Sequence, residues 1–180
     1  MRVAPLLRRA VADEIPALQA LITASARGLA GDDYSPAQIE AALGSAWGVD
    51  SELIRDQTYF VAELDGCMAG CGGWSFRATL FGADAQAGRS SARLDAAVDA
   101  ARIRAFFVRP DWARRGVGRA LLEHCEAAAR VHGFRAAQLM ATLPGVRLYQ
   151  RFGYVAAAPQ DHPLPGGLRI PFVPMHKAPL

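Results

Sequence analysis

The chain has 180 residues, a formal net charge of +3 and 52% hydrophobic residues, and charges of both signs are scattered along it. This length suits one domain over residues 1–180, and this composition argues against intrinsic disorder. No stretch approaches the roughly 20 uninterrupted apolar residues of a membrane span, and charges at positions 8, 9, 13 and 14 interrupt the place where a signal peptide has its apolar core. We therefore expect a cytoplasmic protein with no membrane partner.

The charged residues and the cysteines also limit the partners that the chain can have. Nearly all of the positive charge is arginine, Lys177 is the only lysine, and no basic run is interleaved with aromatic residues. We expect no nucleic-acid partner, and a basic nucleic-acid-binding domain is a minor alternative. Cys67, Cys71 and Cys125 form no CxxC pair, so neither a disulfide framework nor a zinc site is favoured, and we predict no metal site.

The first elements that the pattern predicts are a short strand and two helices. The strand covers residues 6–10. Asp13 then caps a helix whose apolar residues recur at helical spacing, with Pro16 in its first turn. A loop leads to a second helix over residues 36–43, which Ser35 caps and which opens on a proline.

The next segment holds the strongest local signal, a hairpin. The runs TYFVAEL (58–64) and CMAGCGGWSF (67–76) flank Asp65-Gly66, and Asp-Gly between two strand-forming runs favours a two-residue turn. Residues 77–101 follow, rich in Ala, Gly, Ser and Asp and without clear periodicity. This segment is too long for a plain connection in a compact domain, so we interpret it as a lid or a partly ordered insertion.

A strand, a glycine turn and a helix come next. RIRAFFV (102–108) is a predicted strand, and the turn at Gly116 and Gly118 opens a helix with one apolar face that ends at Gly133. RAAQLMAT (135–142) is a further buried strand. A strand, a helix and a strand in succession are typical of a parallel pair.

The C-terminal part adds a helix and a last hairpin. The helix begins near Pro144 and stops at Gly153. Two strands, over residues 155–164 and 168–175, flank the turn-forming residues 165–167, which are Pro-Gly-Gly. The sum is a mixed α/β domain in which antiparallel hairpins surround a central parallel pair of strands.

The stretch RRGVGRALL (114–122) joins the strand to the helix and predicts an anion site. The first free N–H groups of a helix converge at its N-terminus, where the helix dipole also favours negative charge. The two glycines remove Cβ atoms that would keep a phosphate away, and the arginines add charge at the rim. The chain lacks the lysine of a nucleoside-triphosphate loop, and Leu121 stands where a dinucleotide motif has its third glycine. The alternative is a plain tight turn into an ordinary helix.

In the stretches FFVRPDWARRGVGRALLEHCEAAARVHGF and LMATLPGVRLYQRFGY, the chain resembles the GNAT superfamily of acetyltransferases. The resemblance covers most of the chain and implies a mixed sheet with a splayed parallel pair and helices on both faces. It also implies that backbone amides hold the pyrophosphate of acetyl-CoA in a motif written Gln/Arg-x-x-Gly-x-Gly/Ala. Ala113 departs from the first position of this motif, and Arg114 or Arg115 is the expected compensation. The residues expected to line the pyrophosphate are Arg114, Arg115, Gly116, Val117, Gly118 and Arg119.

The resemblance further assigns roles around the thioester. Main-chain groups of Phe107 and Val108 would bind the pantetheine arm, and an amide near Phe106 would polarise the thioester carbonyl. Tyr149 stands where many family members carry the tyrosine that protonates the coenzyme A thiolate, and a phenol with a pKa of about 10 holds its proton at neutral pH. Packing in the core is the alternative interpretation of Phe106, Phe107 and Tyr149.

The resemblance leaves the base open and gives a first outline of the acceptor site. The strand at 102–108 carries no carboxylate, so we expect water to relay the proton. Acceptor pockets in this family form from the loop between the first two helices, the end of the third strand and the last hairpin, which are GDDY, GWSFR and DHPLPGG here. We therefore predict Tyr34 and Trp74 as aromatic walls and Asp33 as an anchor for a cationic amine. Ordinary packing is the alternative for the two aromatic residues.

Together these features predict an acetyl-CoA-dependent N-acetyltransferase that acts on a primary amine, with a small molecule as the acceptor. A protein or peptide N-acetyltransferase is one alternative. A non-catalytic coenzyme A-binding module is another, because no base is found and Ala113 departs from the motif. Members of the family often pair through sheet edges, so the resemblance also implies a homodimer.

Overall fold

The computed structural model describes residues 4–180, which hold eight strands and five α-helices. The helices are α1 (Ile15–Leu29), α2 (Pro36–Leu43), α3 (Ser51–Arg55), α4 (Val117–Val131) and α5 (Val146–Arg151). The strands are β1 (Leu6–Arg9), β2 (Tyr59–Leu64), β3 (Cys67–Ser75), β4 (Ala101–Val108), β5 (Ala137–Ala141), β6 (Val155–Ala156), β7 (Gln160–Pro163) and β8 (Arg169–Lys177).

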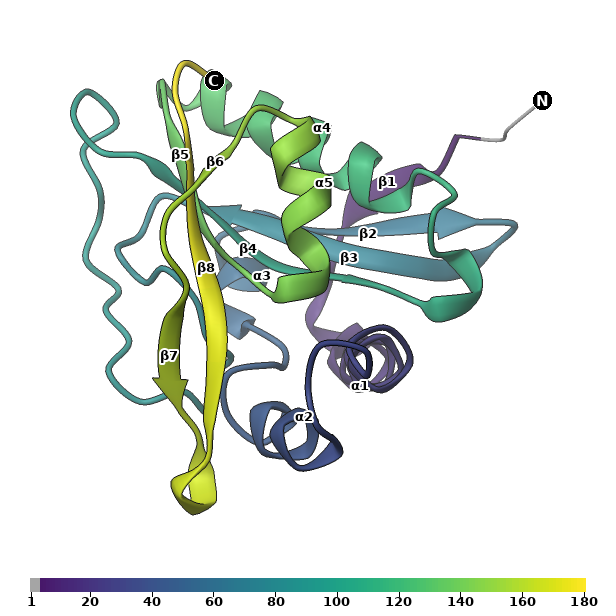
Figure 1. Ribbon diagram of the computed structural model, residues 1–180. Coiled ribbons are helices and arrows are strands. Elements are labelled where there is room, and N and C mark those ends of the chain that lie inside the picture. Colours follow the sequence, from purple (N-terminus) through teal and green to yellow (C-terminus); the bar gives the residue numbers. More distant parts are fainter. Residues whose placement is uncertain (1–3) are drawn as a thin grey trace.

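The strands form one mixed sheet in the order β1-β2-β3-β4-β5-β8-β6, and β7 pairs with β8 off this path. β4 and β5 run parallel, and the other strand pairs of the described chain are antiparallel. Figure 1 shows α4 and α5 on one face of the sheet and α1 and α2 on the other. This arrangement confirms the predicted mixed α/β sheet with a central parallel pair and helices on both faces.

The sheet separates two hydrophobic clusters, because side chains alternate between its faces along each strand. In β2, Phe60 and Ala62 pack in the cluster that α4 covers, whereas Tyr59 and Val61 pack in the cluster that α1 covers. Burying one large apolar side chain contributes about 1.5–3 kcal/mol to stability. The apolar residues of α4 pack in one cluster and those of α1 in the other, so burial in the two clusters holds each helix on its own face.

The hairpin of β2 and β3 forms as predicted. Leu64 pairs with Cys67 across the turn, and both turn residues have positive φ, 50° for Asp65 and 75° for Gly66. Positive φ at both central residues is the signature of a type I′ turn, which matches the twist of the two strands. The Asp-Gly dipeptide thus places β3 beside β2 by local chemistry alone.

The two predicted helix caps have different outcomes. Ser35 caps α2 as predicted: its Oγ accepts from the Gln38 N–H at 3.2 Å. The prediction that Asp13 caps the first helix is wrong, because Asp13 lies in a 3-10 turn ahead of α1. Glu14 accepts a hydrogen bond from the Val11 N–H at 3.0 Å instead. The carboxylate that turns the chain into α1 is therefore one residue later than expected.

The last predicted hairpin forms with an interruption. The strand expected over residues 155–164 is divided into β6 and β7, which both pair with β8. Pro159 lies in the gap, and a proline has no N–H to donate to a strand ladder. As a result, β7 pairs with the first part of β8, Arg169–Phe172, which β5 does not reach.

The parallel strands β4 and β5 separate soon after they pair. They are in register only at Ala101–Ala137 and Arg102–Gln138. Beyond these two pairs the strands diverge, which confirms the predicted splay. The opening leaves backbone groups of β4 without a partner strand on that side.

A bulge in β4 lies at the opening. Ile103 packs on the α4 side, but Arg104 and Ala105 both face the α1 side, and Ala105 has a φ of 55°. Two successive side chains on one face are typical of a β-bulge, which re-aims the residues that follow. Opposite the bulge, a Cβ on Gly72 would lie 2.8 Å from the Phe106 ring. Glycine at position 72 therefore makes room for Phe106.

Residues 77–100 form an ordered wall with no helix and no strand beyond an isolated bridge between Arg77 and Arg93. Ion pairs fix both parts of the segment to the rest of the protein: Arg77 contacts Asp56 at 2.6 Å and Arg89 contacts Asp50 at 2.8 Å. The segment is thus attached to the rest of the domain, and whether it acts as a lid stays a prediction. Within residues 4–180, no helix is both long and apolar enough to cross a bilayer.

Candidate active site

The N-terminus of α4 offers unpaired backbone N–H groups. Gly116 is the N-cap, with a φ of 91°, and no side chain of residues 4–180 caps the helix. The N–H groups of Val117, Gly118 and Arg119 precede the first intrahelical bond, which runs from Ala120 to the Gly116 carbonyl at 2.9 Å. A Cβ on Gly116 would meet nothing within 4 Å, so the space in front of these groups is open. The turn therefore has the features of the predicted anion site.

The arginines of this turn differ in how far they are engaged. Arg115 lies over the Trp112 ring at 4.8 Å, and Arg119 pairs with Glu123 at 2.9 Å. Arg114 is exposed and makes no ion pair within the described chain. Of the three, Arg114 is the arginine whose charge remains free for a phosphate. Ala113, at the motif position, is half-buried and carries no polar group.

A cavity of about 80 Å³ lies where β4 and β5 diverge. Its wall includes residues from both hydrophobic clusters, so the cavity reaches through the opening in the sheet. From the α4 side it is lined by Ile103, Phe106, Leu139 and Tyr149, and from the α1 side by Trp47, Phe81, Ala105, Phe107, Met140 and Phe172. The cavity therefore lies between the two hydrophobic clusters and borders both faces of the sheet.

Tyr149 of α5 lines this cavity as a buried phenol. Its ring packs edge-on against Phe106 at 6.3 Å and against Tyr154 at 5.8 Å. In residues 4–180 its hydroxyl has no hydrogen-bond partner, and burial raises the pKa of Tyr149 above the usual value. The phenol therefore keeps its proton at neutral pH and can donate it to a group that enters the cavity.

Some backbone N–H groups near the bulge already have hydrogen-bond partners within the protein. The Val108 N–H donates to Ser25 Oγ of α1 at 3.2 Å, and the Arg109 N–H donates to the Ala69 carbonyl at 2.9 Å. A pantetheine arm that pairs with β4 would have to use the Val108 carbonyl or displace Ser25. The roles expected for Phe107, Val108 and the amide near Phe106 stay predictions.

The structure does not bring the three predicted acceptor residues together. Asp33 is exposed in the loop between α1 and α2 and does not line the cavity. Tyr34 is 3% exposed, donates to the Pro171 carbonyl at 2.8 Å and accepts from the Leu143 N–H at 2.8 Å. Burial raises the pKa of Tyr34 to about 12. Tyr34 thus lies behind the wall as a fixed support rather than facing a ligand.

Trp74 lies on the other face of the sheet, in the α4 cluster. It is 1% exposed and packs edge-on against Phe76, His132 and Phe134. We expect Trp74→Ala to lower the free energy of unfolding by about 3–5 kcal/mol, because it removes a buried indole and leaves a cavity. Chemical denaturation measures the loss, with Trp74→Phe as the milder control. A folded Trp74→Ala protein with normal stability and an altered choice of acceptor would contradict this placement.

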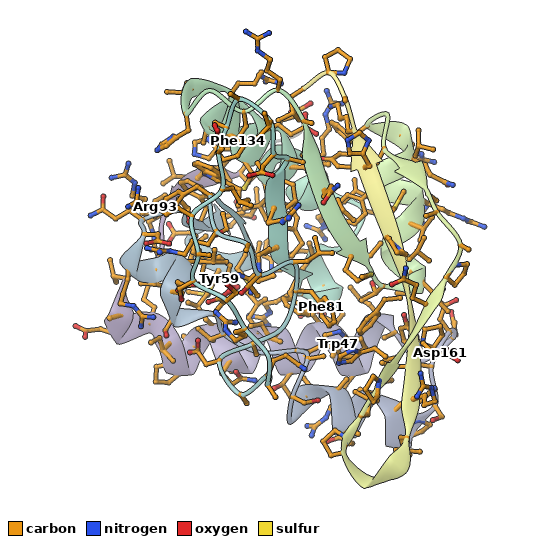
Figure 2. The ribbon with its side chains drawn as sticks, turned by 90° about the vertical axis from the view of Figure 1, so that its left-hand side faces the viewer. Trp47, Tyr59, Phe81, Arg93, Phe134 and Asp161 are labelled. Atoms are coloured by element: carbon orange, nitrogen blue, oxygen red, sulfur yellow. The ribbon has the colours of Figure 1, made fainter. Side chains whose placement is uncertain are left out.

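The cavity wall on the α1 side includes four residues that the sequence did not single out. Trp47 lies between α2 and α3, Phe81 in the 77–100 wall, Arg104 in β4 and Phe172 in β8. Figure 2 shows Trp47 and Phe81 close together, with Asp161 apart on the outer hairpin. Trp47 and Phe81 stand out in the sequence as single aromatic residues in stretches rich in Ala, Gly and Ser. That contrast is the signal that could have found them.

No carboxylate lines the cavity among residues 4–180. His162 of β7 packs edge-on against Phe81 at 4.7 Å, and burial lowers the pKa of His162 below its usual value. The neighbouring Asp161 is exposed. The described cavity wall therefore offers no carboxylate as a general base for the amine. This agrees with the absence of Asp and Glu from the strand at residues 102–108.

Comparison with solved structures shows the fold. The chain is similar to a GCN5-related N-acetyltransferase from Rhodopseudomonas palustris, with 22% identity, a TM-score of 0.72, and 99% of this chain and 98% of that one covered. It is similar to the PaiA N-acetyltransferase of Thermoplasma acidophilum in complex with coenzyme A (14%, TM-score 0.62, 98% and 99% covered). It is also similar to the ribosomal-protein-S18-alanine N-acetyltransferase of Escherichia coli (18%, TM-score 0.58, 97% and 93% covered). These likenesses show that the chain has the fold of these acetyltransferases.

The family follows from the sequence itself. Residues 21–154 match the family model of the Acetyltransferase (GNAT) family, so the chain belongs to the GNAT acetyltransferases, which use acetyl-CoA. No curated protein matches the chain. The similar structures include a ribosomal-protein-S18-alanine N-acetyltransferase and an N-acetylglutamate synthase, whose acceptors differ, so the family fixes the reaction and leaves the acceptor open.

Proposed function

We propose that the protein transfers the acetyl group of acetyl-CoA to the primary amine of a small molecule. The observation that carries this proposal is the cavity between β4 and β5, which is lined from both faces of the sheet. The α4 N-terminus fits the donor, because its unpaired N–H groups face open space at Gly116. The enclosed aromatic wall on the α1 side suits a compact acceptor more than a folded protein surface.

Bound acetyl-CoA supplies an activated acetyl thioester. Around it, the amides of Val117, Gly118 and Arg119, with Arg114 at the rim, would bind the pyrophosphate, and an amide near Phe106 would stabilise negative charge on the thioester oxygen. The reaction forms a bond between the acceptor nitrogen and the acetyl carbon and breaks the bond from that carbon to sulfur. Tyr149 gives its proton to the sulfur, and the amine loses one proton to water because no carboxylate of the described chain lines the cavity.

Binding of acetyl-CoA is the first test. At about 100 times its dissociation constant a ligand adds roughly 2.7 kcal/mol, which raises the melting temperature of a protein of this size by about 5–11 °C. We expect this rise with acetyl-CoA and with coenzyme A, and none with ATP or NAD as controls. Thermal unfolding measures it, and an equal rise with ATP would show a general phosphate site instead.

Identification of the acetylated products tests which class of acceptor the enzyme uses. Mass spectrometry of reactions with mixed small amines, with peptides and with folded proteins should find acetylation of small amines. Acetylation of peptide N-termini or of lysine side chains with no acetylated small amine would reject the small-molecule acceptor and favour a protein acetyltransferase. The single domain, the cytoplasmic location and the homodimer stay predictions.

A further inference from the structure

One polar side chain interrupts the apolar wall on the α1 side of the cavity. Arg104 of β4 is 4% exposed and lines the cavity. Its Nη2 donates to the Gly82 carbonyl at 2.8 Å and lies 2.5 Å from Asp50 Oδ2. Its Nε and Nη1 have no hydrogen-bond partner within residues 4–180 and no access to solvent. Three N–H donors of a buried cation are therefore unsatisfied in the free protein.

Unpaired donors of this kind indicate a missing ligand, because buried polar groups in proteins are almost always hydrogen-bonded. Asp50 offers Arg104 one oxygen, Oδ2, beside Nη2, and its other oxygen, Oδ1, accepts from Arg89 at 2.8 Å, so neither oxygen is bonded to Nε or Nη1 of Arg104. Glu52 approaches Arg89 at 3.6 Å and makes no ion pair with Arg104. An acceptor oxygen that carries negative charge would complete the bonds of Arg104.

Arg104 is not the only arginine that attaches the wall at residues 77–100, because Arg89 also does so. Arg89 donates to the carbonyls of Gly82 and Ala83, at 2.7 Å and 3.0 Å, and to Asp50. Arg89 thus makes the same two kinds of contact as Arg104, but it does not line the cavity. The feature that distinguishes Arg104 is its place in the cavity wall.

The rest of the wall on this side limits the other parts of the ligand. Trp47 packs against Phe172 at 6.3 Å, and Phe172 packs against Phe81 at 5.7 Å. These rings surround the cavity with Phe107 and Met140, and no carboxylate among the described residues lines it to hold a second cation. The site therefore offers one positive group and an apolar surface.

We infer that the acceptor is an amine that also carries a carboxylate and an apolar side chain, the chemical class of the apolar α-amino acids. Arg104 binds the carboxylate, and the aromatic wall contacts the side chain. The amine is thereby held near the bulge of β4, on the opposite side of the opening from Tyr149. This inference rests on the proposed acetyl transfer to a small amine and specifies its substrate class.

Matched pairs of acceptors test the inference in the unmodified enzyme. Each pair is an α-amino acid and the amine that lacks only its carboxylate: phenylalanine and phenethylamine, tryptophan and tryptamine, leucine and isoamylamine. Thiol release with acetyl-CoA gives kcat/KM for every compound. For at least one pair we expect kcat/KM to be at least about 10-fold higher for the amino acid, since the decarboxylated amine leaves the buried guanidinium unpaired.

Two variants assign that preference to Arg104. Arg104→Met should raise KM for the amino acid by at least about 10-fold and lower kcat/KM more for the amino acid than for the decarboxylated amine. The matched control is Arg89→Met, which removes the same kinds of contact to Asp50 and Gly82 from a side chain that does not line the cavity, and it should keep the preference. If Arg104→Met does not fold, Arg104→Lys keeps the charge beside Asp50 and should weaken the preference.

The outcomes separate this inference from the proposed function. Faster acetylation of the decarboxylated member in every pair, or an unchanged preference in both Arg104 variants, would overturn the role of Arg104 while acetyl transfer to small amines stands. Stabilisation by acetyl-CoA with no acetylation of any member of the pairs would also overturn it, and would leave donor binding intact. Absence of stabilisation by acetyl-CoA would instead count against the proposed function itself.

Discussion

Replacing Tyr149 by phenylalanine is expected to lower kcat by about 10²- to 10⁴-fold, the usual contribution of a general acid, with little change in acetyl-CoA affinity. Phenylalanine keeps the ring that packs against Phe106 and Tyr154 and removes only the hydroxyl. That hydroxyl holds its proton because burial raises the pKa of Tyr149, and it has no other partner among the described residues. The loss should therefore fall on turnover and not on binding. Steady-state thiol release and thermal unfolding with acetyl-CoA measure the two effects separately.

Tyr154 provides the control for this substitution. It is a second buried tyrosine, in edge-on contact with Tyr149, and it does not line the cavity. We expect Tyr154→Phe to leave kcat within about threefold, because its hydroxyl cannot reach a group in the cavity. A kcat within about twofold of the original in Tyr149→Phe would show that solvent supplies the proton, and the phenol would then be a packing residue only.

A carboxylate at position 116 should have the second large effect, on binding of the donor. Gly116→Asp places a negative charge in front of the free N–H groups of α4, in space that is open in the free protein. Aspartate tolerates the positive φ of 91° better than most residues, so the fold should be retained. Two like charges about 4 Å apart at an effective dielectric constant of about 20 repel by roughly 4 kcal/mol, so the Kd for acetyl-CoA should rise at least about 100-fold. Isothermal titration calorimetry measures the change.

Gly116→Asn is the matched control for the aspartate variant. Asparagine has nearly the same size and tolerates the same backbone region, but it carries no charge. We expect its Kd for acetyl-CoA to lie between those of the original protein and the aspartate variant. Equal weakening in both variants would mean that bulk at position 116, and not charge, blocks the site. Unchanged affinity in both would place the pyrophosphate elsewhere.

The parts of the structure that the sequence predicts are those that local chemistry specifies. Asp65-Gly66 fixes a turn because both residues must adopt positive φ, whatever surrounds them. Gly116 likewise ends the turn before α4 and leaves the first amides of the helix free. Each of these features depends on a few successive residues. For that reason the strands of the β2–β3 hairpin and the start of α4 lie within one residue of their predicted positions.

The acceptor side of the cavity could not be predicted in the same way, because its walls come from segments that lie far apart in the sequence. Trp47, Phe81, Arg104 and Phe172 meet only once β4 and β8 are in place beside the 77–100 wall. Trp74 shows the related error. It was predicted to face the acceptor, but the register of β3 against β4 turns it toward α4. A shift of one residue along a strand exchanges the two faces, and only tertiary pairing sets that register.

The hydroxyl of Tyr34 joins three parts of the chain that lie far apart in sequence. It connects the loop after α1 to the Pro171 carbonyl in β8 and to the Leu143 N–H, just before the helix that carries Tyr149. Its ring meets Trp47 edge-on at 5.7 Å. A compound too large for the pocket would push on Trp47, and the ring beside it, Tyr34, is hydrogen-bonded to the segment just before α5. We expect an oversized acceptor to lower kcat more than it raises KM. The same residue, Tyr34, would then influence both the choice of acceptor and the rate of acetyl transfer.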